Sequence, residues 1–231
     1  MSENKIKLQI NIFGDFSSIQ PNMETIRSLT KNLEEFEFLP QYFQENSLTI
    51  KNVEGDVVDE LRSPDFSSKK RLRLSSIDEN YIIEFSSNII SINVRKENDK
   101  LEDEISKIAS VSMGELRSSR IGIIIIDERD YIPDSVKPSI SYYDELDEFE
   151  IRLNRRKKIN VNNVEQLSNV IINISKPFIF KEVQNKLVQY VCDINTIPEN
   201  EELRFSSDDV ISFLKEAKSQ GISMFESLNG D

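Results

Sequence analysis

The stretch that decides the fold is Lys5-Ile6-Lys7-Leu8-Gln9-Ile10-Asn11-Ile12, close to the start of the chain. Polar and apolar residues alternate through it, and successive side chains of an extended strand point to opposite faces. The apolar side chains therefore share one face, which is typical of a strand with one side in the core and the other in water. Since such strands belong to antiparallel sheets, we expect an antiparallel sheet.

Further stretches predict more strands, separated by turn-prone Asn, Asp, Ser and Gly. Alternation or apolar content places them at 48–50, 71–74, 81–85, 89–94, 149–153, 170–174 and 187–194. The last of these also permits a helix through Val183, Leu187 and Val191. The nearly continuous apolar run Arg120–Ile126 predicts a central strand that is buried on both faces.

Three segments change to helical spacing. The first has Ile26, Leu29, Leu33 and Phe36 on one face and ends at Pro40. The second begins with a capping box of Asp99 and Glu102, followed by Leu101, Ile105, Ile108 and Ser112 on one face. The third begins with a capping box of Ser206 and Asp209, carries the core stripe Val210, Phe213, Leu214 and Ala217, and is interrupted at Gly221.

The order of these elements predicts an α+β fold, with a mostly antiparallel sheet or sheets and about three helices packed on one side. A chain of 231 residues is long enough to bury a sizeable core. We expect a single domain over residues 1–231, with two similar halves, 1–132 and 146–231, as the alternative. The segment between the halves contains Pro133, Pro138 and an acidic run.

The composition excludes several kinds of chemistry. The chain has no histidine and a single cysteine, Cys192. Histidine is the usual base of Ser-His-Asp and Cys-His catalysis and a frequent zinc ligand, so these sites are excluded. No glycine-rich phosphate-binding motif is present, and Cys192 lies among apolar neighbours, as a small buried residue does. We therefore predict no catalytic residue, no cofactor and no metal site.

The net charge of −12 and the pI near 4.7 disfavour polyanionic partners such as duplex nucleic acid and anionic membrane. The chain does not open on an apolar signal-like segment. Its longest aliphatic run, Ile121–Ile126, is far below the ~20 residues of a membrane span. We expect a cytoplasmic protein.

Two basic clusters stand against the acidic total. They are Lys69, Lys70, Arg71 and Arg73, and then Arg152, Arg155, Arg156, Lys157 and Lys158. Neither cluster has interleaved aromatic residues, which single-stranded nucleic acid would need for base stacking. We expect solvated strand ends or an electrostatic contact with an acidic partner.

The strongest enzymatic alternative is the acidic group Asp127, Glu128 and Asp130 at the end of the apolar strand. Hard oxygen ligands on a rigid strand end suit Mg²⁺ or Mn²⁺, and would make the protein a metal-dependent nuclease or phosphotransferase. A restriction-like nuclease pattern is approximated by Asp134 and Glu150-Ile151-Arg152. However, arginine replaces the usual lysine there and cannot lose a proton to act as a base.

Five features in order resemble a sporadically distributed family of uncharacterised bacterial proteins. They are Phe13-Gly14-Asp15-Phe16 with a helix ending at Leu39-Pro40, Leu72-Arg73-Leu74 with a hairpin to Ile92, Arg120-Ile121-Gly122-Ile123, Val191-Cys192-Asp193-Ile194, and a final helix reaching Phe225. The resemblance covers most of the chain. It implies a bacterial or phage origin and assigns no residue a role.

Because catalytic side chains are scarce, we favour a non-catalytic interaction or regulatory protein over an enzyme: an adaptor, inhibitor or accessory subunit, for example in a bacterial or phage conflict system. The expected partner is another protein with a basic surface, or a second copy of the chain. The predicted partner-binding residues lie beyond Gly221, near the chain end, where a terminus usually frays, so they either fold back on the sheet or dock on another chain. They are Ile222, Met224, Phe225 and Leu228.

Overall fold

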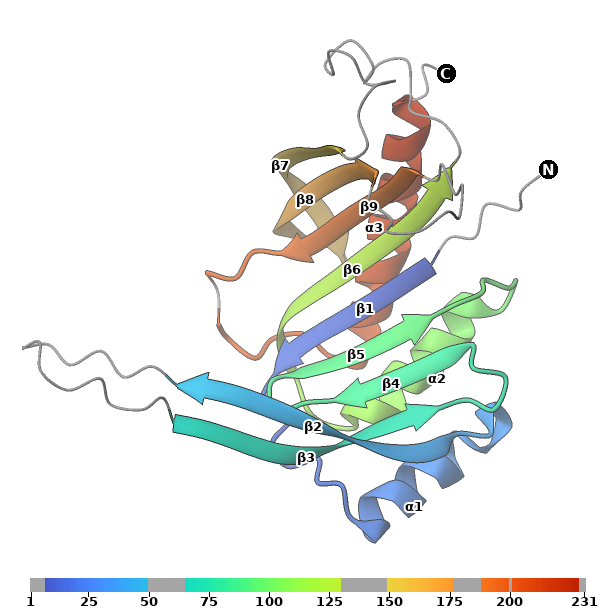
Figure 1. The fold of residues 1–231 in the computed structure, drawn as a ribbon. Coiled ribbons are helices and arrows are strands. Elements are labelled where there is room, and N and C mark those ends of the chain that lie inside the picture. The colour runs from blue at the N-terminus through green and yellow to red at the C-terminus, as the bar shows by residue number, and fades with distance from the viewer. Residues whose placement is uncertain (1–6, 50–64, 130–148, 177–187, 200, 229–231) are drawn as a thin grey trace, which may run out of the picture.

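The computed structural model describes residues 7–49, 65–129, 149–176, 188–199 and 201–228 (Figure 1). The strands are β1 (Lys7–Gly14), β2 (Leu39–Thr49), β3 (Asp65–Ser75), β4 (Tyr81–Phe85), β5 (Ile89–Val94), β6 (Ser118–Arg129), β7 (Phe149–Val161), β8 (Val164–Lys176) and β9 (Val188–Thr196). The helices are α1 (Met23–Asn32), α2 (Leu101–Met113) and α3 (Ser207–Ser227), with a short 3₁₀ turn η1 (Glu34–Phe36) after α1.

The described strands form one sheet in the order β2-β3-β4-β5-β1-β6-β9-β8-β7. Every pairing in it is antiparallel. The α+β class and the antiparallel sheet predicted from the sequence are thus confirmed. β6 hydrogen-bonds both β1 and β9, so the proposed halves 1–132 and 146–231 share a single sheet.

The sheet has two faces, which we call the first face and the second face and define by residues at their centres. The first face carries Ile10 of β1 and its partner Ile123 of β6, both fully buried. The second face carries Asn11 and its partner Gly122. This division follows from the alternation of side chains along each strand, and it puts the apolar positions of the opening stretch in the core as predicted.

Helices contact the first face at several points. The hydroxyl of Tyr81 on β4 donates a hydrogen bond to Glu104 of α2. The Tyr81 ring meets that of Phe36 in η1 edge to face, with centroids 5.5 Å apart. An ion pair between Lys107 and Glu35 joins α2 to η1. The predicted apolar positions of all three helical stripes are buried, except that Phe36 is only partly covered. The first helix is shorter than predicted: α1 ends at Asn32, Phe36 lies in η1, and Pro40 belongs to β2.

One of the two predicted capping boxes is confirmed and the other is wrong. At α3, the Ser206 side chain accepts from the Asp209 N–H while Asp209 accepts from the Ser206 N–H. At α2, the N-cap residue is Lys100, and no side chain caps the helix. The reason is local: Asn98 accepts from the Lys100 N–H and forms a turn that starts the helix one residue later than Asp99 predicts.

α3 does not stop at Gly221, as the sequence predicted, but continues to Ser227. A Cβ on Gly221 would lie 2.7 Å from Cδ1 of Ile125 and 3.4 Å from Sγ of Cys192. Glycine here is therefore a close-packing residue that lets the helix approach β6 and β9, rather than a helix terminator.

Two other expectations are resolved. Residues 188–196 form a strand, β9, so the helical alternative through Val191 is wrong. In β6, Ile121, Ile123 and Ile125 are fully buried, but Ile124 on the second face is only half-buried. The strand is therefore not buried on both faces to the extent that its apolar run predicted.

Across the described residues no helix combines the length and apolar character of a membrane span.

Candidate functional site

A continuous row of polar positions crosses the second face through all nine strands of the described sheet. Strand pairing places these residues side by side in turn, and we call them the polar row. From β2 to β7 they are Gln41, Arg73, Glu84, Ser91, Asn11, Gly122, Asn195, Asn169 and Arg156. No apolar side chain interrupts it.

The centre of the polar row is buried. Asn11 is 9% exposed and Ser91 8% exposed. The Ser91 hydroxyl donates to Oδ1 of Asn11 at 2.7 Å, which satisfies both groups. Beside them Gly122 brings the backbone close to Asn195, since a Cβ would lie 3.1 Å from the Asn195 Cβ. The middle of the face is therefore a polar surface without a large side chain at its centre.

Two arginine–aromatic pairs lie on the same face. The guanidinium of Arg120 stacks on the Phe13 ring at 3.8 Å, and that of Arg73 lies 5.6 Å from the centre of the Phe43 ring. Among the described residues, Nε of both arginines is buried without a hydrogen-bond acceptor. A stacked guanidinium keeps its N–H donors at its edge. Nη2 of Arg73 donates to the Glu84 carboxylate, so Arg73 is ion-paired within the sheet. Arg120 has no acidic partner among the described residues, so it is the cationic donor that this face offers to a ligand or partner.

Arg71, a third arginine on this face, is also paired with an acidic side chain. Arg71 is 5% exposed, and its Nε donates to Glu45 at 2.6 Å. Burial alone would raise the pKa of Glu45, but the hydrogen bond and charge of Arg71, with help from Ser87, outweigh it and lower that pKa. The first basic cluster is thus divided: Arg71 and Arg73 lie on the second face, and Lys70 stacks on Tyr42 of the first.

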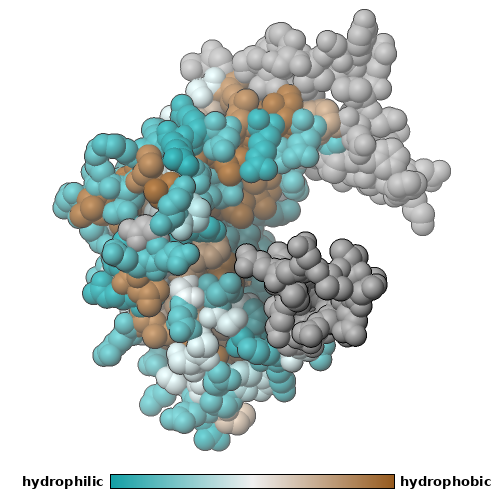
Figure 2. Space-filling view, turned by 90° about the vertical axis from the view of Figure 1, so that its left-hand side faces the viewer, coloured by the Kyte–Doolittle hydropathy of each residue, from teal (hydrophilic) through white to brown (hydrophobic). Residues whose placement is uncertain are grey.

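The side of the molecule that faces the viewer in Figure 1 lies on the right-hand side of Figure 2. This is the side of the polar row.

The predicted acidic metal group does not converge. Asp127 is on the first face, 2% exposed, and binds Nε of Arg129 at 2.7 Å. Glu128 points to the second face, where Lys7 is 3.3 Å away. Asp130 lies outside the described residues. Within the described ranges, no group of three or more acidic or cysteine side chains is placed to hold a metal ion.

The other candidate residues have ordinary structural partners. Glu150 accepts from the Asn173 side chain at 2.9 Å, whereas Asp134 lies outside the described residues. Cys192 is buried, as predicted, and burial raises the pKa of its thiol to about 12. A thiol in that state is not a nucleophile at neutral pH.

The predicted partner-binding residues fall on the last turns of α3. Phe225 is 2% exposed, and its ring meets that of Tyr190 edge to face at 6.0 Å. Phe225 is therefore a core residue, and the expectation of a frayed end is wrong at this position. Ile222, Met224 and Leu228 are half-buried, and the last two pack against the core. Partner binding by these three stays a prediction.

In comparison with known proteins, the chain matches no protein-family model and no curated protein. The polar row escaped the sequence analysis because strand order is not visible there. Its signal was present in the polar positions of each alternating stretch, but only the pairing aligns them.

Proposed function

We propose that this chain is a non-catalytic protein that acts by binding another protein, as an adaptor, inhibitor or accessory subunit of bacterial or phage origin. The second face of the sheet is its docking surface. The single observation that carries this proposal is the stacked guanidinium of Arg120, whose Nε lacks an acceptor among the described residues, on a face crossed by the polar row.

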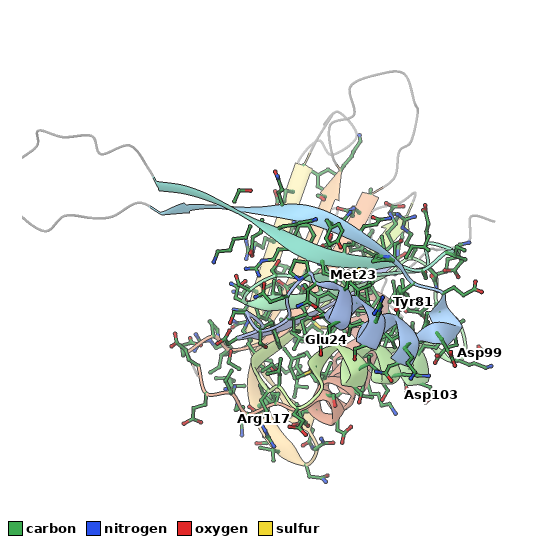
Figure 3. The ribbon with its side chains drawn as sticks, turned by 90° about the horizontal axis from the view of Figure 1, so that it is seen from below. Met23, Glu24, Tyr81, Asp99, Asp103 and Arg117 are labelled. Carbon is green, nitrogen blue, oxygen red and sulfur yellow. The ribbon has the colours of Figure 1, made fainter. Side chains whose placement is uncertain are left out.

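We infer that the three described helices all lie against the first face. α3 packs through Gly221 on Ile125, and α2 reaches Tyr81 through Glu104. Figure 3 shows Glu24 of α1 and Asp103 of α2 on the same side of the β2–β3 strands. This arrangement leaves the second face without a described helix over it, so it is available to a partner.

The chemistry of the second face suits a protein partner. Arginine and aromatic residues are enriched at the energetic centres of protein interfaces, where each is worth about 2 kcal/mol or more. The donors of Arg120 call for carbonyl or carboxylate acceptors on the partner. The net charge of −12 adds long-range attraction toward a protein with a basic surface elsewhere. We propose that the complex forms in the cytoplasm.

The lone buried cysteine makes this proposal testable. Because the Cys192 thiol is protonated and buried, a cysteine introduced at Asn169 on the second face can be labelled selectively with a photo-crosslinker. The matched control is Lys107→Cys on α2, a side chain that is 47% exposed. We expect a protein adduct of discrete mass from the Asn169 position alone.

Substitution then separates docking from chance proximity. Arg120→Ala should abolish the adduct, whereas Arg27→Ala, at an exposed position of α1, should preserve it. Equal crosslinking from both label positions, or an adduct that survives Arg120→Ala, would contradict the proposed docking surface. An adduct with nucleic acid instead of protein would contradict the proposed class of partner.

A further inference from the structure

β7 is an outermost strand of the sheet and pairs only with β8 among the described residues. The two strands join through Asn162 and Asn163, whose φ values of 47° and 68° form a two-residue hairpin turn. The flanking pair Val161–Val164 exchanges both backbone hydrogen bonds in such a turn. This fixes which residues of β7 bond β8.

Hydrogen-bonded and non-bonded pairs alternate along an antiparallel ladder. Counting back from Val161, the odd-numbered residues of β7 bond β8. The even-numbered residues, among them Arg152, Asn154 and Arg156, direct their N–H and C=O groups away from the sheet. No described strand pairs with this row of backbone groups, and its even-numbered residues are exposed, so the row is a template for one more strand.

The opposite edge of the sheet is different. β2 contains Pro40, which has no N–H and interrupts an edge ladder. β7 contains no proline, and its turn is tied to α3. The Asn162 N–H donates to Oγ of Ser212 at 2.8 Å, and its side chain donates to Asp209 at 2.7 Å. The β7 edge is therefore continuous and held in place at one end.

The edge is basic although the chain is strongly acidic. Lys158 binds Glu165 at 2.6 Å, and Arg156 is 3.2 Å from Glu199. Arg152, Arg155 and Lys157 have no acidic partner within the described residues. If the β7 strands of two copies were paired, like charges would face each other, which is unfavourable. Charge complementarity instead selects an acidic strand.

We propose that the β7 edge binds an extended acidic segment of a partner protein as a tenth, antiparallel strand. Acidic side chains of that segment would lie opposite Arg152, Arg155 and Lys157. An apolar residue would cover Leu153, which is 48% exposed on the first face. Main-chain bonds supply the attachment and the side chains supply the selection, as in other strand additions.

This inference names a second contact, beyond the second-face docking surface, and does not depend on it. The competing explanation is protective: charged residues on an exposed edge prevent pairing with other strands. Protection predicts that no peptide binds, so the two explanations have opposite outcomes.

The test uses the full chain and the synthetic peptide Glu-Glu-Glu-Thr-Val-Glu-Val, which runs antiparallel from Lys157 to Ile151. Binding is followed by fluorescence anisotropy of a labelled peptide. We expect saturable binding that weakens with added salt. The same peptide with lysine in place of each glutamate should not bind. The absence of saturable binding by the acidic peptide would overturn the proposal.

N-methylation of the peptide distinguishes strand pairing from charge attraction. Its second, fourth and sixth residues would point their N–H groups at β7, so methylating these should weaken binding by at least about tenfold. Methylating the third and fifth, which point away, should not. Equal affinity of the two methylated peptides would overturn the strand geometry while leaving the crosslinking experiment unaffected.

A protein variant provides the reciprocal test. Asn154→Pro removes an outward N–H without removing a bond to β8, and should abolish binding, whereas Asn154→Ala should retain it. Circular dichroism establishes that both variants fold. If Asn154→Pro does not fold, the methylated peptides on the unsubstituted chain decide the question.

Discussion

At the scale of single residues, Phe225 shows how the structure changes the meaning of a sequence feature. An apolar residue close to the chain end suggested a docking anchor, but its ring is 2% exposed and packs on Tyr190. The guanidinium of Arg129 lies 5.7 Å from the same ring. Phe225 therefore joins the end of α3 to β6 and β9.

We expect Phe225→Ala to lower the free energy of unfolding by about 3–5 kcal/mol, since it opens a cavity in a closed core. Urea unfolding followed by circular dichroism measures this loss. Ser227→Ala, at an exposed position two residues further along α3, is the matched control and should change stability by less than about 0.5 kcal/mol. A loss below about 1 kcal/mol for Phe225→Ala would restore the frayed-end interpretation.

Gly221 gives a second residue-scale prediction, because two effects of adding a methyl group oppose each other. In a helix interior, alanine is favoured over glycine by about 1 kcal/mol. Here the new Cβ would lie 2.7 Å from Cδ1 of Ile125, a fully buried side chain. Overpacking costs about 1–3 kcal/mol, so we expect Gly221→Ala to destabilise the protein in thermal unfolding.

A double-mutant cycle identifies the cause. Ile125→Val removes Cδ1 and should itself cost about 0.5–1.5 kcal/mol. In that background, Gly221→Ala should become neutral or stabilising. If its effect is the same in both backgrounds, the contact with Ile125 is not what requires glycine.

At the scale of elements, the start of α3 depends on Asp209. Burial alone would raise the pKa of this carboxyl, but hydrogen bonds from Ser206 and from the Asn162 side chain outweigh burial and lower it. A lowered pKa in the folded state means that the ionised carboxylate stabilises the fold. That contribution is present above the ordinary pKa of 3.8 and is lost as the pH falls through the lowered value.

We therefore expect Asp209→Asn to cost about 1 kcal/mol at neutral pH, as loss of a capping interaction does. The difference from the unsubstituted protein should be smaller at an acidic pH well below 3.8 than at neutral pH, because Asp209 becomes protonated in both states once the pH has fallen through its lowered folded-state pKa. Urea unfolding at both pH values measures it. Asp208→Asn, exposed in the same turn, is the control, and a difference independent of pH would contradict the role given to the ionised carboxylate.

The sequence predicted elements better than it predicted their ends and their alignment. Alternation around Ile10 and helical spacing around Leu214 depend on burial of one face, and both proved correct. The cap at Asp99 and the stop at Gly221 failed because a turn at Asn98 and close packing against Ile125 decided them. The polar row was invisible because strand order brings its members together from distant parts of the chain.

At the scale of the whole molecule, local and total charge have opposite signs at the proposed contact surfaces. The net charge is −12, yet β7 carries a run of basic residues and the second face presents Arg120. Basic patches alone would attract any polyanion at short range. The field of the whole chain opposes that attraction at distances up to a Debye length, about 8 Å at physiological ionic strength. Selective binding of a protein segment is consistent with both facts.

Nonspecific binding of DNA tests whether the basic residues or the net negative charge of the chain dominates. Affinity for duplex DNA comes mainly from counterions released by phosphate contacts, and it falls steeply with salt. Because the total charge opposes every such contact, we expect a dissociation constant weaker than about 1 µM at physiological salt, the tight end of nonspecific binding. A gel-shift titration with a random duplex gives this constant. If the duplex binds more tightly, and if Arg152→Glu with Arg155→Glu abolishes that binding, then β7 is a phosphate-binding edge and the acidic segment proposed for it is wrong.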